Sequence, residues 1–480
     1  MKEQSGRKAT LFEAMIPIIA LMLFLGVGIF MYGASPHVPL VGATAVAGIV
    51  GVYRLGFKWK DLETSMFDSI KMAMQAILII MIIGILIGTW IVSGVVPCMI
   101  YWGLKILSPN IFLVAAVLVC AVVSLATGSS WSTMGTVGVA LLGIGQSLGI
   151  PIGLVVGSII SGAYFGDKIS PLSDTTNLAP AMAGTDLFTH IKYMLYSTIP
   201  SLIICLVIYG IIGMKYSGQA LDVSQIELIR STLLSSFNTL SPVLLLAPVI
   251  VIGLVVFKVP AIPGLLVGAV TGILFAIFLQ GQSIGVILES AQNGYMSQTG
   301  VAIVDDLLSK GGLMNMMSTV SMTICALSLG GILEKTGMLE VVASSLLRFA
   351  KGVFGTVFCT MITCFFTNAI AGEQYLSIVI PGRMYSKEYE KRGIHPKMLS
   401  RALEDSGTLS SPLVPWNTCG AYIAGTLGVS AFVYAPYALL NIINPIVSLI
   451  LIACKFKIAK IDDEPETCLN LNNGETINLV

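Results

Sequence analysis

The chain has 480 residues, of which 55% are hydrophobic and only 11% are charged, and its mean hydropathy is +0.90. Soluble domains carry about 25% charged residues, so this composition excludes a soluble globular protein and predicts a polytopic protein that lies almost wholly in a lipid bilayer. The formal net charge of +1, without a basic tract, gives no indication of a nucleic-acid partner.

The metal-binding and catalytic side chains are few and scattered. The nine cysteines form no CxxC pair and mostly interrupt apolar runs, so we interpret them as small packing residues. The three histidines are far apart, and no HExxH motif is present. The segment YFGD at 164–167 has Tyr164 where the GxGD motif of intramembrane aspartyl proteases needs glycine. We therefore expect neither a cofactor nor an enzyme.

The first 71 residues predict a group of scaffold helices. Apolar runs at 12–33 and 38–54 approach the roughly 20 residues that a membrane span needs, and 57–71 is amphipathic, as in a helix at the membrane surface. The basic start of the chain precedes a run without a small-residue cleavage site, so we expect a retained first helix and not a signal peptide.

Residues 72–214 predict a first repeat with two unusual elements. Two apolar arms of 13–16 residues flank a polar tip at 127–136. Each arm is too short for a full span, so we expect a re-entrant hairpin. The next span, 151–186, is broken by the sequence GDKISPLSDTTNLAP at 166–180. Its prolines and carboxylates predict unwound backbone at membrane depth, and the alternative is a cytoplasmic loop between two helices.

The same pattern returns after a linker. Residues 215–313 combine polar connections with two further scaffold spans, and 314–456 predict a second repeat with a hairpin tip at 367–375 and a broken helix at 397–430. The polar tail, 457–480, is expected to be disordered.

Three local matches in the same order link the two halves. GTWIVSG at 88–94 resembles GILEKTG at 331–337, both hairpin tips open on threonine, and Ser-Pro-Leu at 170–172 recurs at 411–413. Lysine and arginine gather around the second hairpin, whereas the base of the first holds only Lys105. Cytoplasmic connections are rich in these residues, so we predict inverted repeats and cytoplasmic amino and carboxyl termini. Inverted repeats with broken helices are typical of secondary transporters.

The stretch GDKISPLSDTTNLAPAMAGTDLFTHI at 166–191, with TGSSWSTMGT ahead of it, resembles the signature region of the NhaC-type sodium/proton antiporters. The resemblance runs through nearly the whole chain, and the family includes exchangers of organic acids such as malate and lactate. It implies secondary active antiport on an all-α scaffold of hairpins and broken helices. It does not fix the substrate.

The first broken helix offers a cluster of oxygen ligands for a hard cation such as sodium. These are Ser173, Asp174, Thr175, Thr176 and Asn177. Because desolvation favours a neutral carboxyl group, protons and sodium could compete for Asp174, which we predict to be the shared site.

The neighbouring polar residues keep two interpretations each. Asp167 is a second acid or the structural partner of a nearby cation. Lys168 could neutralise a carboxylate when sodium leaves, or form a plain structural ion pair. Ser129, Ser130 and Thr133 at the first tip could add oxygens or simply pack as small residues.

The second half offers matching acids and ligands without copying the motif. Glu373 lies at the hairpin tip and Asp405 in the broken helix, and the polar positions that accompany them are Ser410, Ser411 and Asn417. The counterpart of Asp174 is missing, so we expect two unequal half-sites.

These features predict a sodium/proton antiporter of the cytoplasmic membrane that works by alternating access. The alternative is a sodium- and proton-coupled carboxylate exchanger, for example of malate against lactate. The expected partners are sodium, protons, in the second case a small carboxylate, and the lipid bilayer. The outer spans could form a scaffold, which makes a homodimer the assembly to test.

Overall fold

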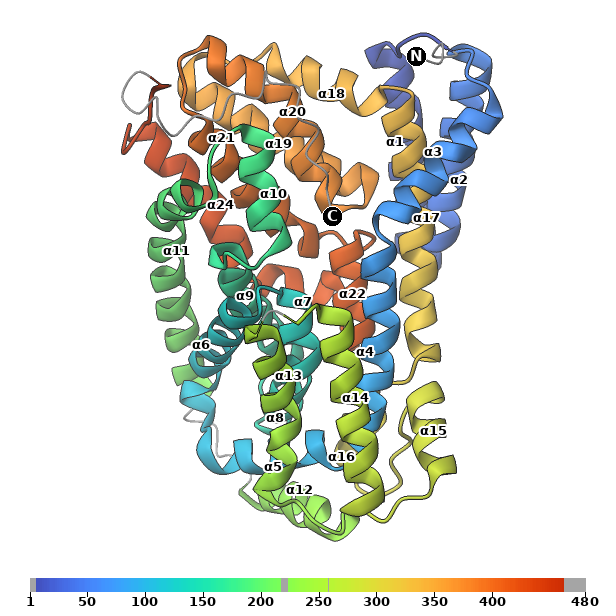
Figure 1. The fold of residues 1–480 in the computed structure, drawn as a ribbon, viewed down its shortest axis with the longest axis vertical. Coiled ribbons are helices and arrows are strands. Elements are labelled where there is room, and N and C mark those ends of the chain that lie inside the picture. Colours follow the sequence, from blue (N-terminus) through green and yellow to red (C-terminus); the bar gives the residue numbers. More distant parts are fainter. Residues whose placement is uncertain (1–5, 217–222, 258, 462–480) are drawn as a thin grey trace.

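The computed structural model describes residues 6–216, 223–257 and 259–461, and within these ranges the elements are helices (Figure 1). Nine helices of the described chain are long and apolar enough to cross a membrane, so the protein is an all-α, multi-pass membrane protein. These are Leu11–Ile29, His37–Arg54, Met74–Val92, Pro109–Thr127, Ile152–Ile169, Leu187–Tyr216, Ala261–Phe278, Met314–Lys335 and Gly352–Ala371.

The first half of the chain contains one long hairpin and one interrupted helix. In chain order its elements are α4 (Met74–Val92), α5 (Val95–Ile106), α6 (Pro109–Thr127), α7 (Ser130–Thr133), the π-helical η3 (Met134–Gly138), α8 (Val139–Ser147), α9 (Ile152–Ile169), α10 (Asp174–Ala183) and α11 (Leu187–Tyr216). Helices α6 and α9 pack closely because α9 has glycine at the crossing: a Cβ on Gly162 would lie 2.2 Å from the Val117 carbonyl oxygen.

The second half also contains a long hairpin and an interrupted helix. Its elements are α17 (Met317–Lys335), α18 (Met338–Leu347), α19 (Gly352–Ala371), α20 (Gln374–Lys391), α21 (Pro396–Leu403), the π-helical η6 (Glu404–Thr408), the short η7 (Ser411–Leu413), α22 (Thr418–Leu427), α23 (Ala431–Tyr434), η8 (Ala435–Tyr437) and α24 (Leu439–Ala453). The chain bends by 91° between α22 and the Ala431–Tyr437 segment.

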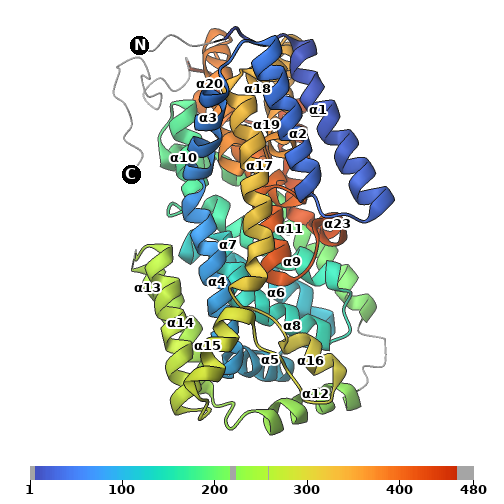
Figure 2. The same ribbon diagram turned by 90° about the vertical axis from the view of Figure 1, so that its right-hand side faces the viewer.

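Each half is preceded by helices that pack against the other half. Before the first half come α1 (Leu11–Leu25), η1 (Gly26–Met31), α2 (His37–Ile49), η2 (Val50–Arg54) and α3 (Trp59–Met72), and before the second come α12 (Val223–Ser236), η4 (Pro242–Leu245), α13 (Leu246–Val256), α14 (Ala261–Phe278), α15 (Ile284–Asn293), α16 (Ala302–Leu308) and η5 (Met314–Met316). Helices α2 and α3 pack on α17, whereas α14 and α15 pack on α4 (Figure 2).

Two glycines mark these crossed contacts. A Cβ on Gly331 of α17 would lie 2.6 Å from the Ser65 carbonyl oxygen of α3, and one on Gly88 of α4 would lie 2.1 Å from the Ser290 carbonyl oxygen of α15. Only a residue without a side chain allows helices to approach this closely. The expected surface helix at 57–71 is thus α3, which is covered along one side by α17.

The helix that follows each break also packs against the opposite half. Ala179 and Ala183 of α10 are buried in a cluster with α19, α20 and α21 of the second half. Tyr422 of α22 is buried in the cluster of the first half, where its ring stacks on Trp131 with centroids 4.3 Å apart. The two halves therefore share one interior, which buries most of the second break, whereas Pro171 and Leu172 of the first break are exposed.

The breaks are shorter than the sequence suggests. We expected unwound backbone over 166–180, but α9 continues to Ile169 and α10 begins at Asp174, so only 170–173 is non-helical. Pro171 lies in that gap, whereas Pro180 is accommodated inside α10. The second tip, expected at 367–375, narrows to Gly372 and Glu373 because α19 runs to Ala371. Of the tail expected to be disordered, 462–480 lies outside the described residues.

Candidate functional site

Side chains of α10 hold the first break in place. The Thr176 hydroxyl donates to the carbonyl oxygens of Asp167 and Lys168, at 3.1 and 3.0 Å, and so satisfies the carboxyl end of α9. The Asn177 amide donates to the carbonyl oxygens of Pro171 and Ser173, at 2.9 and 2.7 Å. These four hydrogen bonds hold the backbone of the break in a defined conformation.

Asp167, in the last turn of α9, meets the tip of the first hairpin. Its carboxylate accepts a hydrogen bond of 3.0 Å from the Ser130 amide, at the start of α7. Ser129 caps α7 by accepting from the Ser132 amide at 3.1 Å, and the Thr133 hydroxyl donates to the Ser129 carbonyl at 2.9 Å. A carboxylate at a helix amino end is electrostatically favourable, so the hairpin tip and the broken helix stabilise each other.

The tip of the second hairpin faces the start of α10. Glu373 is buried and caps α20 by accepting from the Tyr375 amide at 2.8 Å. The Tyr375 hydroxyl donates to the Asp174 carboxylate across the two halves at 3.4 Å. Asp174 is exposed, whereas Ser173 and Thr175 beside it are buried, with their hydroxyls 3.2 Å apart. These groups form an oxygen-rich rim at the interface of the halves.

The second break is organised by two asparagines. Asn417 caps α22 by accepting from the Cys419 amide at 3.0 Å, and its own amide donates to the Asn368 side chain at 3.0 Å. Asn368 in turn donates to the Gly407 carbonyl and to the Ser410 hydroxyl, at 2.6 and 2.9 Å. The Ser411 hydroxyl donates back to the Thr408 carbonyl at 2.7 Å. Polar side chains here form hydrogen bonds with backbone groups that have no helical partner at the break.

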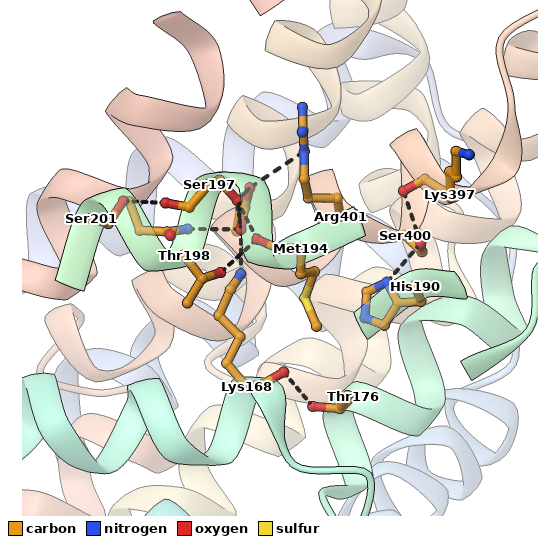
Figure 3. A network of polar contacts seen from close by, with 12 residues as sticks. Lys168, Thr176, His190, Met194, Ser197, Thr198, Ser201, Lys397, Ser400 and Arg401 are labelled. Carbon is orange, nitrogen blue, oxygen red and sulfur yellow. Dashed lines mark hydrogen bonds and ion pairs between the residues drawn. The ribbon is translucent and has the colours of Figure 1, made fainter. Parts of the chain in front are cut away.

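A buried ion pair joins the two broken helices. The Lys168 ammonium of α9 contacts the Asp405 carboxylate of η6, and both side chains are fully buried. Asp405 also accepts from the Ser197 hydroxyl of α11 at 3.1 Å and from the Asn444 amide of α24 at 2.7 Å (Figure 3). An unpaired charge buried at this depth is costly. Moving the halves apart would leave both charges unpaired, so the ion pair favours one relative position of the two halves.

A second cation lies against the same carboxylate. Arg401 is 1% exposed, and its Nε is 3.8 Å from the Asp405 carboxylate, while its guanidinium lies over the Tyr193 ring at 4.6 Å. None of its three side-chain nitrogens has a hydrogen-bond partner in the described structure. Nearby, His190 Nδ1 is 2.8 Å from the Ser400 hydroxyl. Arg401 therefore places unpartnered donors beside Asp405.

The described residues contain no group of three or more His, Cys, Asp or Glu side chains that could hold a metal ion. A cation handled here would be transported cargo, bound by a few carboxylates together with hydroxyl and carbonyl oxygens, which are the ligands that hard cations prefer.

Comparison with known proteins decides the family. Residues 162–456 match the model of the "Na+/H+ antiporter family". The chain belongs to this family. It is 39% identical to the Na(+)/H(+) antiporter NhaC of Alkalihalophilus pseudofirmus over 92% of the chain and 96% of that relative. Family members are transporters, so this antiporter-family protein is not an enzyme.

Other relatives of similar identity carry different names. The chain is 37% identical to the "Malate-2H(+)/Na(+)-lactate antiporter" of Bacillus subtilis, covering 91% of the chain and 93% of the relative. It is 38% identical to the "Arginine/ornithine antiporter ArcD" of Halobacterium salinarum, covering 92% and 91%. Family membership alone therefore leaves the substrate of this antiporter-family chain open.

The predicted site residues of this family member are divided between the two hairpin tips, the Lys168–Asp405 pair and the second break. Asp167, Ser129, Ser130 and Thr133 meet at the first hairpin tip, while Asp174 lies against the second. Lys168, by contrast, points to Asp405. As cation ligands, all the residues named from the sequence stay predictions.

Sequence reasoning missed several members of the Asp405 surroundings. Ser197, Asn444 and Arg401 were not singled out, and neither was Tyr375 beside Asp174, although each is a polar residue in or beside an apolar run. A lone polar side chain in a membrane span is a usable signal, because it needs a partner there.

Proposed function

We propose that this protein is a sodium/proton antiporter of the cytoplasmic membrane that works by alternating access. The observation that carries the proposal is the meeting of both broken helices at one buried charge cluster, Lys168 with Asp405, in a chain of the Na+/H+ antiporter family. Intramembrane charge pairs between discontinuous helices are the usual binding and coupling elements of secondary transporters.

We propose further that the halves, 72–214 and 314–456, are inverted repeats flanked by scaffold regions 1–71 and 215–313. Both hairpins turn at a left-handed glycine, Gly128 at φ +65° and Gly372 at φ +66°. The Ser124 side chain donates to the Ala163 carbonyl at 2.6 Å, and Asn368, at the equivalent point before the second turn, donates to the Gly407 carbonyl at 2.6 Å. A repeated chain is the simplest reason for such repeated contacts.

The distribution of basic residues supports cytoplasmic termini. Lysine and arginine gather at the end of the molecule that holds the starts of α1 and α3 together with α18 and α20, the upper end of Figure 1. These residues are Arg7, Lys8, Lys58, Lys60, Arg348, Lys351, Lys387, Lys391 and Arg392. Cytoplasmic segments are enriched in them, so this end would face the cytoplasm.

We place the exchange site at Asp174, with Ser173 and Thr175 as oxygen ligands and Asp167 as a second acid. Asp174 is accessible, lies at the first turn of α10 and contacts Tyr375 of the opposite half. Sodium or a proton could neutralise this carboxylate in turn. Tyr375 and Glu373 would then sense which ion is bound, because they belong to the hairpin that closes over it.

The test uses proteoliposomes with a pH dye inside, to which a sodium gradient is applied. We expect sodium-driven proton movement in the wild type and its loss in Asp174→Asn. The matched control is Asp186→Asn, because Asp186 ends the same segment and its cap on the Thr189 amide survives as asparagine. Sodium-driven proton flux that persists in Asp174→Asn would refute the assignment of the site.

A carboxylate exchanger is the second candidate. Arg401 favours it, because a buried guanidinium without hydrogen-bond partners is suited to a bidentate carboxylate ligand. The same vesicles then receive malate or lactate on each side. If sodium alone moves no protons, and exchange begins only with a carboxylate present, the protein is an organic-acid exchanger.

We also propose a homodimer formed through the outer helices. Apolar side chains such as Phe12, Leu23 and Phe278 are exposed on α1 and α14, where a second copy or lipid would cover them. Cross-linking in native membranes tests this assembly, and monomers alone after cross-linking would contradict it.

A further inference from the structure

One turn of η6 buries three oxygen atoms that nothing satisfies. Both carboxylate oxygens of Glu404 and the hydroxyl of Thr408 lack a hydrogen-bond partner in the described structure, and both residues are 0% exposed. They lie four residues apart, so they share one face of the turn. The turn is π-helical, a geometry that often marks functional sites.

The cations near this carboxylate are already engaged. Lys168 of α9 and Arg401 of α21 both act on Asp405. The other groups that face Glu404 are Asp167 of α9, the Thr408 hydroxyl of its own turn and the Thr175 hydroxyl of α10, which lies 3.2 Å from the Ser173 hydroxyl. His190 of α11 lies in the same region with one ring nitrogen unpartnered. Within the part of the chain that the structure describes, Lys168 is the nearby cation that acts on Glu404, but its ion pair is with Asp405.

Burial without a partner constrains the charge of this group. An ionised carboxylate removed from water costs several kcal/mol unless a cation or hydrogen-bond donors compensate it. In the described structure Glu404 has neither. It is therefore neutral, or it binds a cation that the protein admits. A purely structural role would be served better by an apolar residue, which needs no hydrogen-bond partner or counter-ion.

We propose that Glu404 and Thr408 form a second site for the transported cation, distinct from the Asp174 carboxylate, and that the Thr175 hydroxyl lies between the two positions and serves both. The site offers carboxylate and hydroxyl oxygens, the ligands of a hard cation such as sodium, and it combines η6 of the second half with α10 of the first. A cation held there would connect the two halves directly. This inference rests on the proposed sodium transport and adds a second ion position to it.

The experiment measures equilibrium binding of radioactive sodium to the purified full-length protein in detergent. The wild type is expected to bind two sodium ions. Glu404→Gln is expected to remove one of them, and Asp174→Asn the other. Thr408→Val keeps the carboxyl group but removes the hydroxyl, so it should weaken one site about tenfold, which corresponds to about 1.4 kcal/mol. Thr408→Ser, which keeps the hydroxyl, is the matched control and should bind as the wild type does.

The outcomes separate the two proposals. Wild-type stoichiometry and affinity in both Glu404→Gln and Thr408→Val, with sodium binding lost in Asp174→Asn, would overturn the second site and leave the proposed function standing. A wild type that binds no sodium would overturn both. If Glu404→Gln fails to give a single peak on size exclusion, the pair Thr408→Val and Thr408→Ser decides alone, because neither changes a charge.

Discussion

Lys168 and Asp405 are unequal partners, and this inequality gives a measurable prediction. Lys168 has no hydrogen-bond acceptor other than Asp405 in the described structure, whereas Asp405 keeps the Ser197 hydroxyl, the Asn444 amide and the nearby Arg401. Removing the carboxylate leaves a buried ammonium group without compensation. Removing the lysine leaves a carboxylate that three groups still support.

The magnitudes follow from these contacts. Asp405→Asn should lower the free energy of unfolding by about 3–5 kcal/mol, the cost of leaving a buried charge unpaired. Lys168→Met should cost about 1.5–3 kcal/mol, the value of a hydrogen bond to a charged group. The double variant removes both charges together and should be less destabilised than the sum of the single variants by at least about 2 kcal/mol.

The assay is unfolding of the four proteins by SDS in mixed micelles, followed by far-UV circular dichroism. The exposed pair Arg230–Glu227 is the control, since a surface ion pair should give a coupling of about 0–1 kcal/mol. If the effects of Lys168→Met and Asp405→Asn add within about 0.5 kcal/mol, the two side chains do not stabilise each other, and our account of the cluster is wrong.

Two further predictions concern the hairpin turn and a polar connection. Gly372→Ala should lower the free energy of unfolding more than Gly352→Ala does. Both substitutions add about 1–2 kcal/mol of strain in a left-handed backbone conformation, but only at residue 372 would the new Cβ meet a neighbour, the Ala326 Cβ at 2.7 Å. Unfolding of the two variants by SDS measures the difference. Hydrogen bonds from the Thr299 amide and hydroxyl and from the Ser297 hydroxyl lower the pKa of Asp305. The ionised carboxylate therefore stabilises its loop fully at pH values above the ordinary pKa of aspartate. This stabilisation is lost as the pH falls through the lowered pKa. Hydrogen exchange at the Thr299 amide should therefore accelerate on acidification relative to neighbouring amides, and an unchanged ratio would contradict this.

Hydropathy and turn residues predicted much of the fold. The two hairpins and the two broken helices were expected from the sequence, because apolar runs and prolines act locally. The family was expected from the resemblance of the motif at 166–191. The number of non-helical residues in each break was not predicted correctly. Thr176 and Asn177 can bond to backbone from within a helix, so polar residues alone did not reveal that α10 starts at Asp174.

The charge cluster was predicted only in part. The sequence suggested a carboxylate partner for Lys168 and placed Asp405 in the second broken helix, but their pairing joins residues 237 positions apart and depends on how the halves pack. Arg401 escaped notice because it lies in a basic stretch that charge patterning assigned to the cytoplasm. Long-range packing, which one sequence does not encode locally, decides such partners.

The crossed packing of the leading helices has a consequence for how the protein is made. The α4 face around Gly88 is covered by α15, which is translated about 200 residues after α4. Because translation proceeds at about 5–20 residues per second, this face of α4 lies uncovered in the bilayer for roughly 10–40 s before α15 is made. The first half therefore finishes folding only after α15 of the following linker has been made. A chain stopped between α11 and α15 would present this open face to lipid and to the quality-control proteases of the membrane.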